Sequence, residues 1–191
     1  MKKLVITLVV AVTTLIQAQA QSAGGEVKVK VNLELNPFQS ISIGTGASSE
    51  GDYGDQVTLR YSSLTDYKEG VRNTVEDQLL VSSVGSGYTI SAAFKSGGTI
   101  TSNFIPGTNA GSDPINIADI LEIKVGNISS TTTPLSYVFG DNTASSSVID
   151  QSLPVTYIGN PITASSTLGK LFATNAQAKY SVDVIYTIAA N

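Results

Sequence analysis

The chain has no histidine, no cysteine and no tryptophan among its 191 residues. Without histidine and cysteine it cannot build a Ser–His or Cys–His nucleophile, and it lacks the ligands used by nearly all zinc sites. The lack of cysteine also excludes disulfides and a lipid-modified N-terminal cysteine. The lack of tryptophan argues against a carbohydrate-binding module, because aromatic platforms for sugars favour that side chain.

The sequence also lacks the short motifs of nucleotide-binding enzymes. No Gly-rich loop ends in Gly-Lys-Ser/Thr, and no Gly-x-Gly-x-x-Gly follows a predicted strand. The formal net charge is −4 and charged residues make up only 14% of the chain, without a basic cluster of the kind that nucleic acid requires. Fifteen carboxylates are present, but the sequence singles out no catalytic pair among them. We therefore predict no enzyme, no cofactor and no nucleic-acid partner.

The N-terminal residues have the three parts of a cleavable signal peptide. Lys2 and Lys3 precede the uncharged run Leu4–Ile16, and Gln17-Ala18-Gln19-Ala20 supplies an Ala-x-Ala cleavage pattern. The uncharged run is shorter than the roughly 20 residues of a membrane span. We expect a signal peptide over residues 1–20, a flexible leader over 21–25 and no membrane span after cleavage. The protein is then exported to the periplasm, the cell surface or the medium.

The clearest periodic pattern follows the leader, where apolar and polar residues alternate over residues 27–35. This alternation predicts a β-strand with one face in a core and the other in water. Asn36-Pro37 ends the strand, because proline has no backbone donor. The apolar positions are Val27, Val29, Val31, Leu33 and Leu35.

Similar runs recur along the chain with turn signals between them. We expect eight to ten short strands and no long helix, with one short helical turn within 63–76 and loops over 140–152 and 159–169. Gly85-Ser86-Gly87 predicts a hairpin between two of the strands. The pattern indicates one all-β domain over residues 26–191, an antiparallel β-sandwich. Its strands include 38–43, 57–62, 79–84, 88–95, 135–139, 153–158 and 180–188.

Two local features have a binding interpretation beside a structural one. An acidic, glycine-containing loop offers the oxygen ligands that calcium takes, but it lacks the register of an EF-hand, and an acidic surface turn is the alternative. Its carboxylates are Glu50, Asp52 and Asp55. Exposed tyrosines would make a platform for sugars, yet burial is the ordinary explanation for tyrosines in alternating strands. These tyrosines are Tyr61, Tyr88, Tyr180 and Tyr186.

The alternating segment 27–35 has two interpretations. It is the first strand of its own sandwich, or it is donated to another subunit, where its main chain pairs with a sheet edge and its alternate side chains fill pockets. The sequence alone favours the first interpretation. For the second, we expect Val27–Leu35 to be the donated strand, and the C-terminal strand Tyr180–Ile188 is a further candidate contact.

Several segments together resemble one group of proteins. They are the alternating start at Val27, the segment Thr65-Asp66-Tyr67-x-x-Gly70-Val71, the run Leu79–Ser83 leading to Tyr88-Thr89-Ile90, and the closing Tyr180-x-Val182-x-Val184-x-Tyr186-Thr187. With the signal peptide, they resemble small secreted pilin-like and spore-coat-U-like β-sandwich proteins of Gram-negative bacteria. The resemblance implies an immunoglobulin-like sandwich and a structural or adhesive role at the cell surface, and it brings no catalytic residues.

These observations predict a secreted, non-enzymatic surface protein, such as a fimbrial or surface-matrix subunit. Its partners would be copies of itself or other surface subunits, joined through strand 27–35. A stand-alone domain that binds glycan or another surface protein is the first alternative. A carboxylate-dependent glycan hydrolase is the less favoured one.

Overall fold

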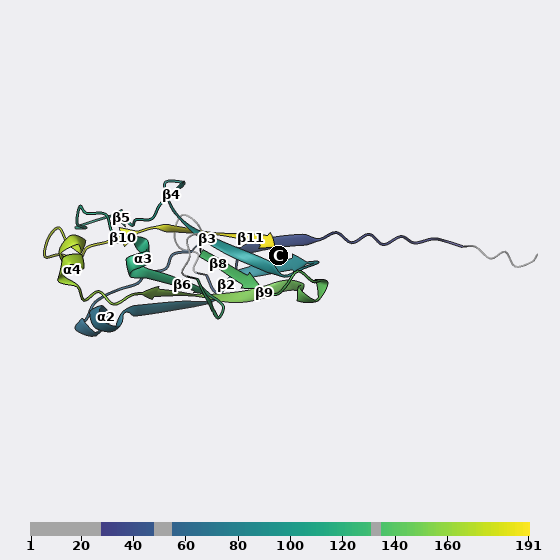
Figure 1. The fold of residues 1–191 in the computed structure, drawn as a ribbon, viewed down its shortest axis with the longest axis horizontal. Helices are drawn as coiled ribbons and strands as arrows, with labels where there is room; N and C mark the ends of the chain where they lie inside the picture. Colours follow the sequence, from purple (N-terminus) through teal and green to yellow (C-terminus); the bar gives the residue numbers. More distant parts are fainter. Residues whose placement is uncertain (1–27, 48–54, 131–134) are drawn as a thin grey trace, which may run out of the picture. The chain divides into compact units, whose positions relative to one another are not determined.

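The computed structural model describes residues 28–47, 55–130 and 135–191 (Figure 1). The chain divides into two units, one before Asn36 and one over Asn36–Asn191. Every helix and strand of the described residues belongs to the second unit. Within the described ranges, no helix has the length and hydropathy of a membrane span. The predicted signal peptide lies outside these ranges.

Strands make up most of the regular structure of the second unit, and the helices are short. The strands are β1 (Phe38–Ile43), β2 (Val71–Val84), β3 (Tyr88–Ser96), β4 (Thr99–Ile100), β5 (Ile105–Pro106), β6 (Leu121–Val125), β7 (Ile128–Ser129), β8 (Leu135–Phe139), β9 (Val148–Gly159), β10 (Tyr180–Ser181) and β11 (Asp183–Ala190). The helices are α2 (Leu64–Glu69), α3 (Ile117–Ile120), the 3-10 turn η1 (Ala144–Ser146) and α4 (Ser165–Leu171).

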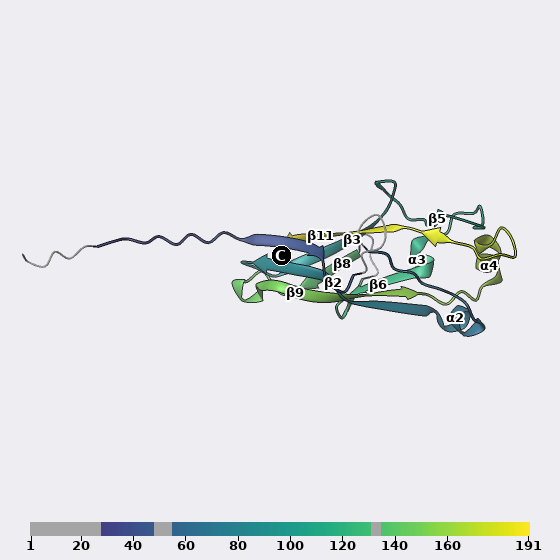
Figure 2. The ribbon, with the colours of Figure 1, turned by 180° about the vertical axis from the view of Figure 1, so that it is seen from behind.

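Two antiparallel sheets pack against each other, as the views from both sides show (Figures 1 and 2). The larger sheet has the order β1-β2-β9-β6-β7. The smaller sheet is built on β3, which pairs with β11 on one side and with β8 on the other, while β4 pairs with its end. The predicted all-β antiparallel sandwich is therefore confirmed.

The core lies between the two sheets and follows the alternation of the strands. In β3, Tyr88, Ile90, Ala92 and Phe94 are buried, and the residues between them are not. Because side chains of a strand alternate between its faces, these four point into the core together. The neighbouring strand β8 and the strands of the facing sheet add further buried side chains, among them Leu135 and Tyr137 of β8 and Leu79, Val81, Ile123, Val125, Leu153, Val155 and Tyr157 of the facing sheet.

The sequence predicted several elements correctly. The strands at 38–43 and 135–139 have the predicted bounds, the strand at 88–95 is β3, and the helical turn within 63–76 is α2.

Several predictions were wrong. Gly85-Ser86-Gly87 does not close the predicted hairpin, because it joins β2 to β3 and these strands lie in different sheets. Three further segments were assigned wrongly. Residues 71–76 belong to β2, residues 148–152 belong to β9 rather than to a loop, and residues 165–171 form α4. The errors over 71–76 and 148–152 share a cause, since these residues pair within one long ladder between β2 and β9.

The strand predicted over 57–62 is not a strand in the structure. The side chains of residues 55–61 still alternate between half-buried and exposed, and Val57 and Leu59 pack against the core. Within the described residues, however, the backbone of 57–61 makes no backbone–backbone hydrogen bond. The segment is therefore extended along the sandwich without being paired to it.

Candidate functional site

Residues 28–35 carry the strongest alternation of the sequence, yet they form no strand in the structure. The strand predicted over 27–35 is thus absent from its described part, and Val27 lies outside the described residues. Val29 is 79% exposed, Val31 86%, and Leu33 and Leu35 each 81%. Burying such a side chain is worth about 1.5–3 kcal/mol. The segment therefore presents a row of large apolar side chains whose burial energy is not used.

Within the sandwich, the edge formed by β1 and β11 is incompletely covered. On β1, Ile41 and Ile43 stand opposite the buried Val81 and Leu79 of β2, so they point to the core face. Ile41 is nevertheless only half-buried, and Ile43 is 48% exposed. Core-facing isoleucines that still contact solvent indicate that one side of the core lacks a cover here.

The same incomplete burial appears on β11. Its Val184, Tyr186 and Ile188 stand opposite Phe94, Ala92 and Ile90 of β3, all of which are buried. The three β11 side chains belong to the same face and pack against the core, but each is only half-buried. No strand of the described residues pairs with the outer side of β11. β1 lies beside β11 without pairing to it, so this partly exposed apolar row lies where the edges of the two sheets meet.

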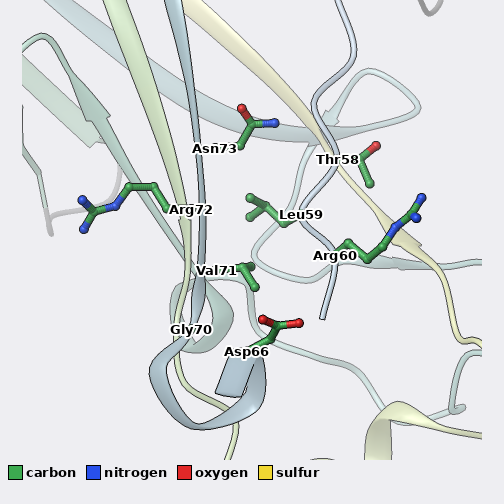
Figure 3. Close-up of a pocket in the computed structure, with 8 residues that line it drawn as sticks. All are labelled: Thr58, Leu59, Arg60, Asp66, Gly70, Val71, Arg72 and Asn73. Carbon is green, nitrogen blue, oxygen red and sulfur yellow. The ribbon is translucent and has the colours of Figure 1, made fainter. Parts of the chain in front are cut away.

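A shallow pocket lies between the segment before α2 and the start of β2 (Figure 3). It has a volume of about 390 Å³. The side chains of Leu59 and Val71 lie between the two segments, while those of Arg60 and Arg72 extend to opposite sides. Most of its lining is polar; the lining residues are Thr58, Leu59, Arg60, Asp66, Gly70, Val71, Arg72 and Asn73.

Among the residues that line this pocket, Asp66 is the one carboxylate, and its side chain caps α2, the helix to which it belongs. The backbone N–H groups of Ser62 and Ser63 donate to its Oδ2 at 2.7 and 2.8 Å, and the Ser63 hydroxyl accepts from the Asp66 N–H at 3.2 Å. This reciprocal cap starts α2. The two backbone donors hold the pKa of the Asp66 carboxyl below its usual value. Asp66 is therefore a capping residue of α2.

Asp66→Asn should lower the melting temperature of the protein at pH 7, because it removes the charged acceptor of the cap. A carboxyl whose pKa is lower in the folded state stabilises that state above its unfolded pKa, and this contribution disappears as the pH falls through the folded pKa. The difference from the wild type should accordingly close below about pH 4. Thermal unfolding followed by circular dichroism between pH 2 and 7 measures it. A difference that is the same at pH 2 would contradict the assignment.

The tyrosines that are candidates for a sugar platform are held in the structure by hydrogen bonds. Tyr88 is buried, and its hydroxyl donates to Gln151 Oε1 at 2.6 Å; burial raises its pKa to about 12. Tyr61, Tyr180 and Tyr186 are half-buried. Their hydroxyls bond to Asn160 O at 2.7 Å, Leu171 O at 2.8 Å and the Tyr157 hydroxyl at 3.0 Å, respectively. Burial as the explanation of these tyrosines is therefore confirmed for Tyr88, while the side chains of the other three are partly buried.

The calcium interpretation falls largely outside the described residues, because Glu50 and Asp52 are not among them. Asp55 is described, and its carboxylate accepts a hydrogen bond from Gln78 Nε2. Across residues 28–47, 55–130 and 135–191, no three acidic side chains gather as a metal site. The structure therefore adds no support for a cation at this loop.

A comparison of the chain with protein-family models finds no match, and a comparison with curated proteins finds none either. Two features of the chain itself are available for a functional proposal. One is the exposed apolar row of residues 28–35, and the other is the half-covered edge of the sandwich.

Proposed function

We propose that this protein is an exported, non-enzymatic surface subunit that assembles by donating residues 27–35 as a β-strand to a neighbouring copy. The observation that carries the proposal is the state of residues 28–35. Their sequence alternates as a half-buried strand does, but they form no strand, and four of their apolar side chains are about four-fifths exposed. A segment built for a sheet and found outside one is suited to strand addition.

Strand addition would give the backbone of residues 28–35 hydrogen-bond partners and would bury their apolar side chains. The main chain would pair with a free sheet edge, and each hydrogen bond would contribute about 1 kcal/mol net. Burying Val29, Val31, Leu33 and Leu35 would contribute about 1.5–3 kcal/mol each. The alternate positions hold Lys28, Lys30, Asn32 and Glu34, which would stay in water on the other face.

The organisation of the chain supports the same proposal. The sandwich of residues 36–191 has a hydrogen-bonded β1 at its start, and the described core side chains all come from this unit. Residues 28–35 contribute none of the buried core side chains of the described chain. We therefore expect the alternating segment to be available to another subunit.

Assembly of the chain without its predicted signal peptide, residues 21–191, tests the function. The protein is unfolded, refolded at increasing concentration and examined by light scattering and negative-stain microscopy. Refolding allows strand exchange that would be too slow between folded subunits. We expect a ladder of oligomers or fibres whose length grows with concentration. A monodisperse monomer at every concentration after refolding would contradict the proposal.

A further inference from the structure

We infer that the pocket of Figure 3 binds an extended acidic peptide, a segment of a partner protein whose apolar and acidic side chains alternate. The inference goes beyond the proposed function, because it gives the chain a second interaction surface that does not depend on residues 27–35. Three properties of the pocket support it: extended backbone without partners on two sides, two arginines without ion pairs, and one wall that belongs to no sheet.

Two walls of the pocket are extended chain with unused backbone groups. On one side, Val71–Val75 of β2 pair with Val155–Gly159 of β9 along one edge. Their other edge has no partner among the described strands, because β1 pairs with β2 only over Leu79–Val84. On the other side, residues 57–61 make no backbone–backbone hydrogen bond within the described chain. Such a row of free donors and acceptors beside a groove is what an added peptide strand pairs with.

A peptide is the ligand class that uses this arrangement. The N–H and C=O groups of an extended peptide recur at about 3.3 Å per residue, the same spacing as those of Val71–Val75. An acidic glycan would meet the positive charge of the pocket but has no regular row of donors and acceptors for the edge of β2. The unpaired backbone therefore favours a peptide.

The positive charge of the pocket comes from Arg60 and Arg72. Both side chains are exposed, while their neighbours Leu59 and Val71 are half-buried, so both arginines belong to the outward face of their segments. Neither guanidinium forms an ion pair or a hydrogen bond with another residue of the described ranges. The carboxylate of Asp66 accepts from two backbone N–H groups of the α2 cap. The two arginine charges thus remain for an acidic ligand.

The side chains around the pocket indicate which peptide pattern fits. Those of Leu59 and Val71 lie between the two segments, whereas the two arginines extend outward from them (Figure 3). A strand added between the segments would place every second side chain beside Leu59 and Val71 and the others on the outward face of the arginines. Apolar side chains suit the first set of positions and carboxylates suit the second.

The wall formed by residues 57–61 can move without breaking a sheet. Val57 and Leu59 pack against the core, and the Tyr61 hydroxyl donates to Asn160 O at 2.7 Å. No ladder of backbone hydrogen bonds in the described chain holds this segment. Because such segments open at a lower free energy than paired strands, an incoming peptide can widen the pocket and leave the sandwich folded.

The alternating segment of the proposed function fits this pocket poorly. Its polar positions include Lys28 and Lys30. Lysines placed beside Arg60 and Arg72 would repel them, so the pocket selects a chain of the opposite charge. Peptide binding and strand donation are therefore separate properties with separate tests.

Fluorescence anisotropy with labelled peptides tests the inference on the dilute mature chain, residues 21–191. The first probe is Val-Glu-Val-Glu-Val-Glu-Val, and the second has lysine in place of each glutamate. Two further probes keep the charge but carry N-methyl groups on the valines or on the glutamates. Because successive N–H groups of a strand point to opposite sides, these two probes block each edge in turn. Polygalacturonate, an acidic glycan, is added as a competitor.

The protein variants are Arg60→Glu, Arg72→Glu and both together. Lys170→Glu on α4 is the matched control, since it makes the same charge change at an exposed position outside the pocket. Thermal unfolding of each variant, followed by circular dichroism, separates a loss of binding from a loss of fold. The double variant is also tested with the lysine probe, because reversed charges on both sides should restore the attraction.

We expect saturable binding of the glutamate probe. Its Kd should rise at least tenfold with the lysine probe, with one of the N-methylated probes and with each arginine variant, and less than twofold with Lys170→Glu. The double variant should prefer the lysine probe.

Three results would overturn the inference. They are no saturable binding of the glutamate probe, equal binding of both N-methylated probes and the unmodified one, and equal effects of the arginine variants and Lys170→Glu. Displacement of a weakly bound probe by polygalacturonate at far lower concentration would overturn the choice of a peptide and reassign the pocket to an acidic glycan. None of these results changes the expected oligomer ladder, so assembly through residues 27–35 is tested separately.

Discussion

We expect the replacement of Val29 and Val31 by aspartate to abolish assembly and to leave the fold of the sandwich intact. Both side chains are exposed in the single chain, so the substitutions remove no contact from the core. In the assembled form they would place two carboxylates between the sheets, where an unpaired charge costs several kcal/mol. We expect the oligomer ladder of the refolded chain to disappear, while the melting temperature of the monomer changes by less than about 2 °C.

The control introduces one carboxylate on the other face of the same segment. Asn32 lies between Val31 and Leu33 in the sequence. In an added strand its side chain would point to water, so Asn32→Asp places the carboxylate on that face. It should assemble like the wild type when followed by light scattering under the same refolding conditions. Equal loss of assembly in Asn32→Asp and in the double valine variant would show that charge alone, and not the apolar face, governs the effect.

Ile90→Ala should strongly destabilise the sandwich. Ile90 has no exposed surface and stands in the central strand β3, opposite Tyr137 of β8 and Ile188 of β11. Truncating a buried isoleucine removes transfer energy and leaves a cavity, which together cost about 2–5 kcal/mol. For a domain of this size the melting temperature should fall by roughly 5–15 °C.

The control for this substitution is Ile100→Ala on β4, where the isoleucine is 73% exposed. It removes the same atoms from a site that is already in water, so the expected change is within about 0.5 kcal/mol. Urea unfolding followed by tyrosine fluorescence compares the two variants at 25 °C. Equal loss of stability at both positions would contradict the placement of the core between β3 and the facing sheet.

The strands that the sequence predicted best are those whose burial follows from local alternation. In β3 the structure buries the apolar residue at every second position from Tyr88 to Phe94. In β8 it buries Leu135 and Tyr137 and leaves Val138 exposed. The extensions of β2 and β9 were missed because Arg72, Asn73 and Thr74 show no apolar alternation. These residues are held in a strand by pairing with β9, more than 80 residues away in the chain.

The candidate site, like the strands, could be predicted from the sequence only in part. The alternating segment was visible in the sequence, because five alternating apolar residues stand together between a predicted leader and Asn36-Pro37. What the sequence could not show is that residues 28–35 remain outside every strand. Nor could it show that β11 is an edge, because this depends on which strands pair with β3. The half-covered row on β11 is visible only once that order is known.

Hydrogen exchange of the backbone amides of residues 28–35 tests strand donation most directly. The amides are compared, by mass spectrometry, in the dilute monomer and in the refolded material at high concentration. Strand donation predicts full exchange within seconds in the monomer and slowing by at least a hundredfold in the assembled form. Protection of residues 28–35 in the dilute monomer, or fast exchange in both samples, would contradict it.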